Sequence, residues 1–121
     1  MTYPFSMPNQ VTNFDAIDYV PKRAMVIFAH PDDAEIGAGA TAALWAAKGC
    51  EITYVQCTTG SSGSNDTEMT SERIVTIRSV EQRAAADAIG VSDIVVLDHP
   101  DGELEAGRVF LGEVVHALRK Y

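Results

Sequence analysis

Long apolar segments and cysteines are scarce in this sequence. No run approaches the roughly 18 apolar residues that a membrane-spanning helix requires, and the opening MTYPFSMPNQ lacks the charged start and apolar centre of a signal peptide. We therefore expect a cytoplasmic protein that does not bind membranes. The two cysteines, Cys50 and Cys57, do not have the spacing of a zinc knuckle, so we interpret them as reduced, packed thiols.

Positive charge is also scarce. The 121 residues include 9 Lys and Arg against 17 Asp and Glu, which gives a formal net charge of −8. The basic residues are scattered and form no patch, which argues against nucleic-acid binding. An acidic chain can still bind a neutral small molecule or a metal ion, and this length is enough for one domain with its own core.

Apolar runs alternate with helical patterns along most of the chain. Strands are predicted at residues 24–29, 51–57 and 93–98, and helices at 34–48, 71–90 and 107–121. Residues 1–22 contain three prolines and no periodicity, so we interpret them as a lead-in to a domain at residues 23–121. Strands separated by helices pair in parallel, which predicts an α/β fold: a Rossmann-like sheet between two helical layers.

The apolar spacing in each predicted helix indicates which face packs on the sheet. The expected inward positions are Ile36, Ala40, Ala43, Leu44 and Ala47 in the first helix, Ile74, Ile77, Val80, Ala84 and Ala88 in the second, and Val109, Leu111, Val114, Val115 and Leu118 in the third.

The most informative segment, AHPDDAEIGAGAT at residues 29–41, follows the first predicted strand. Its two adjacent aspartates, Asp32 and Asp33, repel each other, and a bound cation would relieve that repulsion. A neutral His30 and the carboxylate of Asp33 can hold one ion, with zinc distances of about 2.0–2.2 Å. Asp32 would then lie close enough to take a proton from water. The alternative is an ordinary solvated turn that caps the following helix.

Polar residues follow each of the three predicted strands. In an open parallel sheet, ligands bind beyond the carboxyl ends of the strands. We therefore expect these positions to share one rim: His30, Asp32 and Asp33 after the first strand, residues 58–65 after the second, and Asp98 and Asp101 after the third.

Four segments together resemble the PIG-L/LmbE family of metal-dependent de-N-acetylases: AHPDDAEIGAGAT, TTGSSGS, IRSVEQRAAADAIGV and LDHPDGEL. The likeness covers approximately residues 22–104. It implies hydrolysis of the acetamide of N-acetylglucosamine-type sugars or related amides. It also implies that His30 and Asp33 bind Zn²⁺ or another divalent transition metal and that Asp32 is the general base. Arg78 and Asp101 would hydrogen-bond sugar hydroxyls.

The chain also departs from the family pattern. Ala40 replaces the second glycine of a usual pair, and Ser61 stands where an acidic residue is common. Members of the family are much longer, and their second half supplies a histidine-rich motif with the third metal ligand. We therefore expect this chain to resemble an incomplete N-terminal half that is inactive alone. In the Rossmann order 3-2-1, strand 24–29 would be an edge through which the chain self-associates.

Two other classes of protein remain open. In a phospho-receiver domain, Asp32 and Asp33 would bind Mg²⁺ and Asp98 would accept a phosphoryl group. That interpretation leaves His30 without a role and provides no later strand for the Thr and Lys of such a switch. The third possibility is a non-catalytic, Rossmann-like binding remnant.

Three other polar residues have ordinary explanations. His99 lies near the predicted rim but is typical of a solvated turn, and His116 falls inside the last predicted helix. Arg78 and Glu81, three residues apart on one helix, would by default form a modest surface ion pair.

Overall fold

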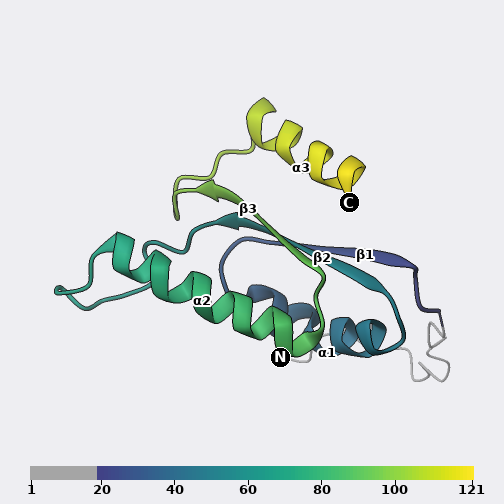
Figure 1. Ribbon diagram of the computed structural model, residues 1–121. Coiled ribbons are helices and arrows are strands. Elements are labelled where there is room, and N and C mark those ends of the chain that lie inside the picture. Colours follow the sequence, from purple (N-terminus) through teal and green to yellow (C-terminus); the bar gives the residue numbers. More distant parts are fainter. Residues whose placement is uncertain (1–18) are drawn as a thin grey trace, which may run out of the picture.

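The computed structural model describes residues 19–121, in which three strands alternate with three helices (Figure 1). In chain order they are β1 (Arg23–Phe28), α1 (Asp33–Ala47), β2 (Glu51–Thr58), α2 (Ser71–Ile89), β3 (Asp93–His99) and α3 (Arg108–Lys120). This confirms the predicted α/β class and every predicted element. The boundary predicted between a lead-in at 1–22 and a domain at 23–121 stays a prediction, since most of the lead-in lies outside the described residues.

The three strands form a parallel sheet in the order β1-β2-β3. Val26 of β1 pairs with Tyr54 of β2, which in turn pairs with Ile94 of β3. The central strand is therefore β2, and β1 is an edge within the described part of the chain. This order contradicts the phospho-receiver interpretation, because in that doubly wound fold the first strand lies between the second and third.

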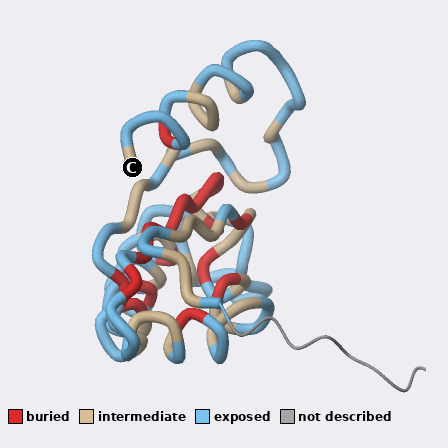
Figure 2. The backbone as a smooth tube through the Cα atoms, turned by 90° about the vertical axis from the view of Figure 1, so that its right-hand side faces the viewer, coloured by how far each residue is buried: buried red, intermediate tan, exposed pale blue. Residues whose placement is uncertain are grey.

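The helices divide between the two faces of the sheet (Figure 1). Helices α1 and α2 cover one face and contact each other, whereas α3 lies over the opposite face. Figure 2 shows buried positions concentrated in the strands and in the layer beneath them, while α3 is mostly exposed. The main cluster includes Phe28 and Tyr54, whose rings meet edge to face with centroids 5.3 Å apart. The predicted three-layer arrangement is confirmed, and the layer formed by α3 packs less closely on the sheet than the layer formed by α1 and α2.

Helix ends follow local chemistry. The Thr70 side chain accepts a hydrogen bond from the Arg73 amide at the start of α2, which is a standard N-cap. At the other end of α2, Gly90 adopts φ 93° and closes the helix in the left-handed conformation that glycine favours. Helix α1 starts differently, because its N-cap is Asp32, a non-glycine residue that is also left-handed.

The predicted inward faces of the helices are largely wrong. Ile36 of α1 is 82% exposed, and the buried positions of that helix are Ala34 and Ala42. On α2, Ile74 is buried as expected, but the buried stripe continues through Gln82 and Ala86, four residues apart. The remaining predicted positions that are exposed are Ala40, Leu44 and Ala47 on α1, Ile77, Val80, Ala84 and Ala88 on α2, and Val109, Leu111 and Leu118 on α3. Four of the six buried positions of the described helices are alanines, which permit close approach to the sheet, and the other two are Ile74 and Gln82.

Both cysteines lie in or beside β2 and are buried without forming a disulfide. Burial raises the pKa of the Cys50 thiol, with a smaller contribution from Glu51, and burial likewise raises the pKa of Cys57, with a smaller contribution from Glu113. The interpretation as packed thiols agrees with this environment. None of the described helices is long and apolar enough to cross a membrane.

Candidate active site

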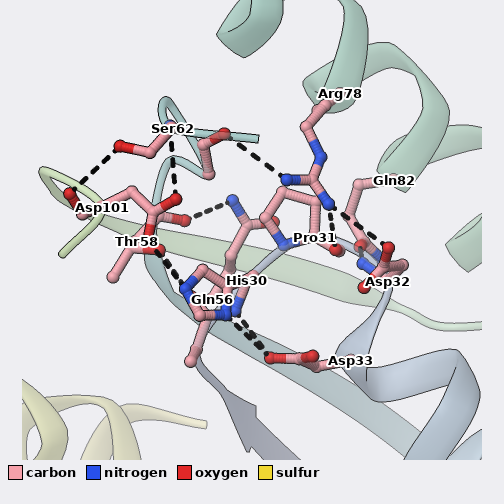
Figure 3. Close-up of polar contacts among 12 residues, drawn as sticks. His30, Pro31, Asp32, Asp33, Gln56, Thr58, Ser62, Arg78, Gln82 and Asp101 are labelled. Carbon is pink, nitrogen blue, oxygen red and sulfur yellow. Dashed lines mark hydrogen bonds and ion pairs between the residues drawn. The ribbon is translucent and has the colours of Figure 1, made fainter. Parts of the chain in front are cut away.

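The turn between β1 and α1 holds the first site residues in a constrained conformation (Figure 3). The His30 amide donates to Asp33 Oδ2 at 2.9 Å, which ties the start of the turn to the start of the helix. Between them, Asp32 has φ 87° and ψ −24°, a left-handed conformation that is sterically unfavourable for a residue with a Cβ. Its side chain is nevertheless 65% exposed and points toward Arg78. The surrounding structure must therefore hold this backbone in place.

Residues following all three strands meet at this turn. His30 Nε2 lies 2.8 Å from Asp101 Oδ1, although the two residues are 71 positions apart. The Ser62 amide, in the loop after β2, donates to Asp101 Oδ2 at 3.3 Å. Residues after all three strands thus share one rim as predicted, although Asp98, which was expected there, makes none of these contacts. Asp101 already has a partner for each carboxylate oxygen, and its binding of a sugar hydroxyl stays a prediction.

His30 and Asp33 have a geometry that suits a divalent ion. With a neutral imidazole and an ionised Asp101, which only accepts, the contact at Nε2 requires the imidazole proton on Nε2 and leaves a lone pair on Nδ1. That Nδ1 is 3.4 Å from Asp33 Oδ2. Two ligands of a tetrahedral ion with bonds of about 2.0–2.1 Å are separated by about 3.3 Å. Two acceptor atoms that face each other at this separation are stabilised by a cation between them.

The described residues contain no complete set of metal ligands. Within residues 19–121, no three His, Cys, Asp or Glu side chains converge into a set that could hold a metal ion. Catalytic zinc sites use three protein ligands and an open position. His30 and Asp33 therefore fit two of the three positions.

Arg78 of α2 reaches over the same turn. Its Nη2 donates to the Pro31 carbonyl at 2.8 Å and lies 3.3 Å from Asp32 Oδ2, while Nη1 lies 3.4 Å from the Gly60 carbonyl. The ordinary ion pair expected between Arg78 and Glu81 is not among the salt bridges of the described residues. Arg78 thus connects α2 to the turn and to the loop after β2.

Two glycines leave room for the Arg78 guanidinium. A Cβ on Gly60 would lie 2.8 Å from Arg78 Nη1 and 2.9 Å from Pro31 Cδ, and one on Gly63 would lie 2.6 Å from the same Nη1. Gly60 also has φ 69°, which other residues rarely adopt. The TTGSSGS segment therefore has a steric role in the site, which its sequence alone did not indicate.

Two site residues were missed by sequence reasoning. Gln82 of α2 is 3% exposed, accepts from the Asp32 amide at 2.9 Å, and donates through Nε2 to Glu35 Oε1 at 2.9 Å. The signal that could have identified Gln82 is its spacing, one helical turn after Arg78 on the side of α2 that faces the turn. Glu35 carried no comparable signal, because a carboxylate in the first turn of a helix is common.

The other polar residues considered lie elsewhere. His99 contacts Glu113 of α3 at 2.6 Å and stacks edge to face with Phe110, so its ring faces away from the His30 turn. His116 lies on α3, within the helix predicted for it, and is exposed. Asp98, with φ 63°, lines a cavity between β3 and α2 and makes none of the contacts of the turn.

The fold and this rim define a class: an α/β protein with a polar, acidic site at the carboxyl ends of parallel strands, where such folds bind ligands. The model of the PIG-L family, described as GlcNAc-PI de-N-acetylase, matches residues 25–121. The chain belongs to the PIG-L family.

Several characterised proteins are similar to this chain. A diacetylchitobiose deacetylase of Thermococcus kodakarensis is 34% identical over 99 residues, which cover 82% of this chain and 37% of that protein. A 1D-myo-inositol 2-acetamido-2-deoxy-alpha-D-glucopyranoside deacetylase of Kineococcus radiotolerans is 31% identical, covering 89% of this chain and 33% of that protein. The chain therefore spans only about a third of the length of these two relatives.

Solved structures also resemble this chain, and one of them is named for a different reaction. The N,N'-diacetylchitobiose deacetylase of Pyrococcus horikoshii superposes with a TM-score of 0.79 at 33% identity, covering 82% of this chain and 37% of that one. GalB, the 4-carboxy-2-hydroxymuconate hydratase of Pseudomonas putida KT2440, superposes with a TM-score of 0.74 at 29% identity, covering 82% and 43%. The same arrangement of strands and helices is thus found in a protein named for a different reaction.

Proposed function

We propose that this chain supplies the N-terminal part of the active site of a metal-dependent de-N-acetylase that acts on N-acetylglucosamine-type sugars. The observation that carries the proposal is the convergence of His30 Nδ1 and Asp33 Oδ2, 3.4 Å apart, beside the exposed carboxylate of Asp32. The curated relatives support the substrate class, because both that we compared are named as deacetylases of acetamido sugars.

His30 and Asp33 are the residues that would hold the ion, which we propose to be Zn²⁺ or another divalent transition metal. When bound, such an ion supplies a positive charge that polarises the acetamide carbonyl and acidifies water. Asp101 fixes the orientation and tautomer of His30 through the 2.8 Å contact at Nε2. The backbone amide of His30 similarly fixes Asp33.

Asp32 is the proposed general base. Its carboxylate adjoins the two metal-binding positions without belonging to them, and Arg78 Nη2 fixes the direction of Oδ2. Asp32 would accept the proton of the attacking water and return it to the departing amine. Arg78, held by the Pro31 carbonyl, keeps other N–H groups available for a sugar hydroxyl.

A third protein ligand has to come from outside the described residues. The relatives extend well beyond the part that this chain matches, so their remaining length is the proposed source. We propose accordingly that the 121-residue chain binds zinc weakly and has no deacetylase activity by itself.

The proposal is tested by measuring acetate and free amine from N-acetylglucosamine and diacetylchitobiose. The assay compares the 121-residue chain with the complete protein that carries these residues, each with and without a chelator. Metal-dependent release of acetate by the complete protein alone is the expected result. If the complete protein binds these sugars without cleavage, the non-catalytic interpretation holds. Because GalB shares the fold, hydration of a 2-hydroxymuconate is assayed in parallel.

Self-association of the isolated chain through the β1 edge is a separate proposal. In the described sheet β1 pairs only with β2, and Ile27, on the face opposite the core, is 41% exposed. An unpaired apolar edge recruits another strand, and a charge there prevents it. Light scattering is expected to give a dimer or larger species for the wild-type chain and a monomer for Ile27→Lys. The matched variant Leu44→Lys, at an exposed position of α1, should leave the mass unchanged. A wild-type monomer at high concentration contradicts the proposal.

A further inference from the structure

A pair of side chains, buried Gln82 and half-buried Glu35, connects α2 and α1 to the strained residue of the turn. Gln82 Oε1 accepts from the Asp32 amide at 2.9 Å, and Gln82 Nε2 donates to Glu35 Oε1 at 2.9 Å. The amide of glutamine has one accepting and one donating end. Because Glu35 occupies the donating end, Gln82 can present only its oxygen to Asp32.

The hydrogen bond from the Asp32 amide to Gln82 acts on a residue with a strained backbone. Asp32 is one of two described non-glycine residues with positive φ, and such a conformation persists only when its surroundings hold it. Arg78 holds the turn from its carbonyl side and from the Asp32 carboxylate. Gln82 holds the amide of the same residue, so two residues one helical turn apart on α2 fix both the backbone and the side chain of Asp32.

The hydrogen-bonded pair of Gln82 and Glu35 destabilises the fold if it serves only packing, because polar groups are removed from water. Gln82 takes a core position of α2 that an apolar residue would fill, and Glu35 Oε2 is buried with no hydrogen-bond partner among the described residues. Burial, and next the charge of Glu35, raise the pKa of Tyr54, whose hydroxyl is also buried without a partner. A polar arrangement this unfavourable points to a role outside stability.

We infer that Gln82, oriented by Glu35, is a positioning residue that aims the Asp32 carboxylate at the reacting water. The inference rests on the proposed function for the role of Asp32 and on the two hydrogen bonds for the geometry. Neither Gln82 nor Glu35 touches the substrate or the ion in this assignment. They act through the backbone of Asp32.

A reciprocal exchange of the two side chains tests the inference in the complete protein. Gln82→Glu can still accept from Asp32 but cannot donate to Glu35, so kcat should fall about 10- to 100-fold, the range for lost outer partners, with KM nearly unchanged. Glu35→Gln alone retains an acceptor for Gln82 but no longer forces the donating end of Gln82 toward position 35, so its kcat should fall, though less than that of Gln82→Glu. The double variant Glu35→Gln, Gln82→Glu keeps the hydrogen bond from the Asp32 amide to the side chain at position 82. It restores the bond between positions 35 and 82 with donor and acceptor reversed, and it should recover most of the rate.

A second readout does not depend on catalysis. Gln82→Leu removes the acceptor of the Asp32 amide while filling the buried space. In protein labelled with ¹⁵N-aspartate, hydrogen exchange of that amide should become at least about fivefold faster, in keeping with the net worth of one hydrogen bond. Arg83→Ala is the matched control. Arg83 is next to Gln82 in the chain but is exposed, and its ion pair with Asp87 is long, at 4.0 Å. This variant should change neither the exchange of the Asp32 amide nor kcat.

The outcomes separate this inference from the proposed function. If wild-type protein releases no acetate, the proposed function fails, and the exchange measurement still decides whether Gln82 holds Asp32. If wild-type protein is active but the double variant is no faster than Gln82→Glu, the positioning role is overturned. Unchanged exchange of the Asp32 amide in Gln82→Leu overturns it as well. A kcat loss that follows the melting temperature across all variants indicates a purely structural pair and also overturns it.

Discussion

Asp32→Asn in the complete protein is expected to lower turnover about 100-fold or more, which is the usual contribution of a general base. Asparagine preserves the shape of the side chain and can remain beside Arg78, but it does not accept a proton at neutral pH. The metal content should stay near that of wild type, because Asp32 Oδ2 faces Arg78 and not the gap between His30 and Asp33. Metal analysis after gel filtration, together with the rate of acetate release, measures both quantities.

The control for this variant is the same carboxylate-to-amide change at a position away from the turn. Glu72→Gln removes an exposed carboxylate from the first turn of α2, and Glu72 does not line the cavity beside Asp32, so its rate and metal content should match those of wild type. If Asp32→Asn loses metal as completely as activity, Asp32 is a ligand and the division of roles is wrong. If it retains full turnover, another group is the base.

Asp33→Asn is expected to weaken metal binding by more than the roughly 10- to 100-fold that loss of an outer partner produces. The amide substitution removes the negative charge that faces His30 Nδ1 at 3.4 Å and replaces a good ligand with a poor one. Activity should fall at low metal concentration and recover in part when metal is added in excess. Isothermal titration of the metal-free protein with Zn²⁺ gives the change in affinity directly.

This second variant has a structural control built into the site. Asparagine at position 33 can still accept from the His30 amide through its side-chain oxygen, so the turn is kept. A variant that melts as wild type but binds metal weakly therefore reports the loss of a ligand. Wild-type zinc affinity in Asp33→Asn would exclude Asp33 from the metal site.

The motif at residues 29–41 gave the most reliable structural predictions. An apolar run that ends in His30 and two aspartates predicts a parallel strand with a polar site at its carboxyl end, because the chemistry and the topology are both local. The structure agrees on the element order, and it brings Asp101 to His30 as the rim argument expected. Helix ends such as that at Gly90 were equally local.

Helix faces were predicted poorly, for a physical reason. Helix α1 is rich in alanine, so its apolar spacing hardly distinguishes one side from another, and the side that packs is the one where small residues permit close approach. On α2 the buried stripe includes Gln82, a residue that no hydrophobic pattern assigns to a core. Its burial depends on partners 47 and 50 positions away in sequence.

The sequence by itself determined the α/β class, the strands and helices, and the candidate ligand pair His30 and Asp33, since each depends on residues close together in the chain. Only the tertiary structure decided which strand is central, because strand order depends on how the helices cross the sheet. It also decided that Arg78 and Gln82 fix Asp32, and that Asp101 meets His30 while His99 faces α3. Such contacts join segments that are distant in sequence, and their hydrogen bonds form only when the packed sheet brings the strand ends together.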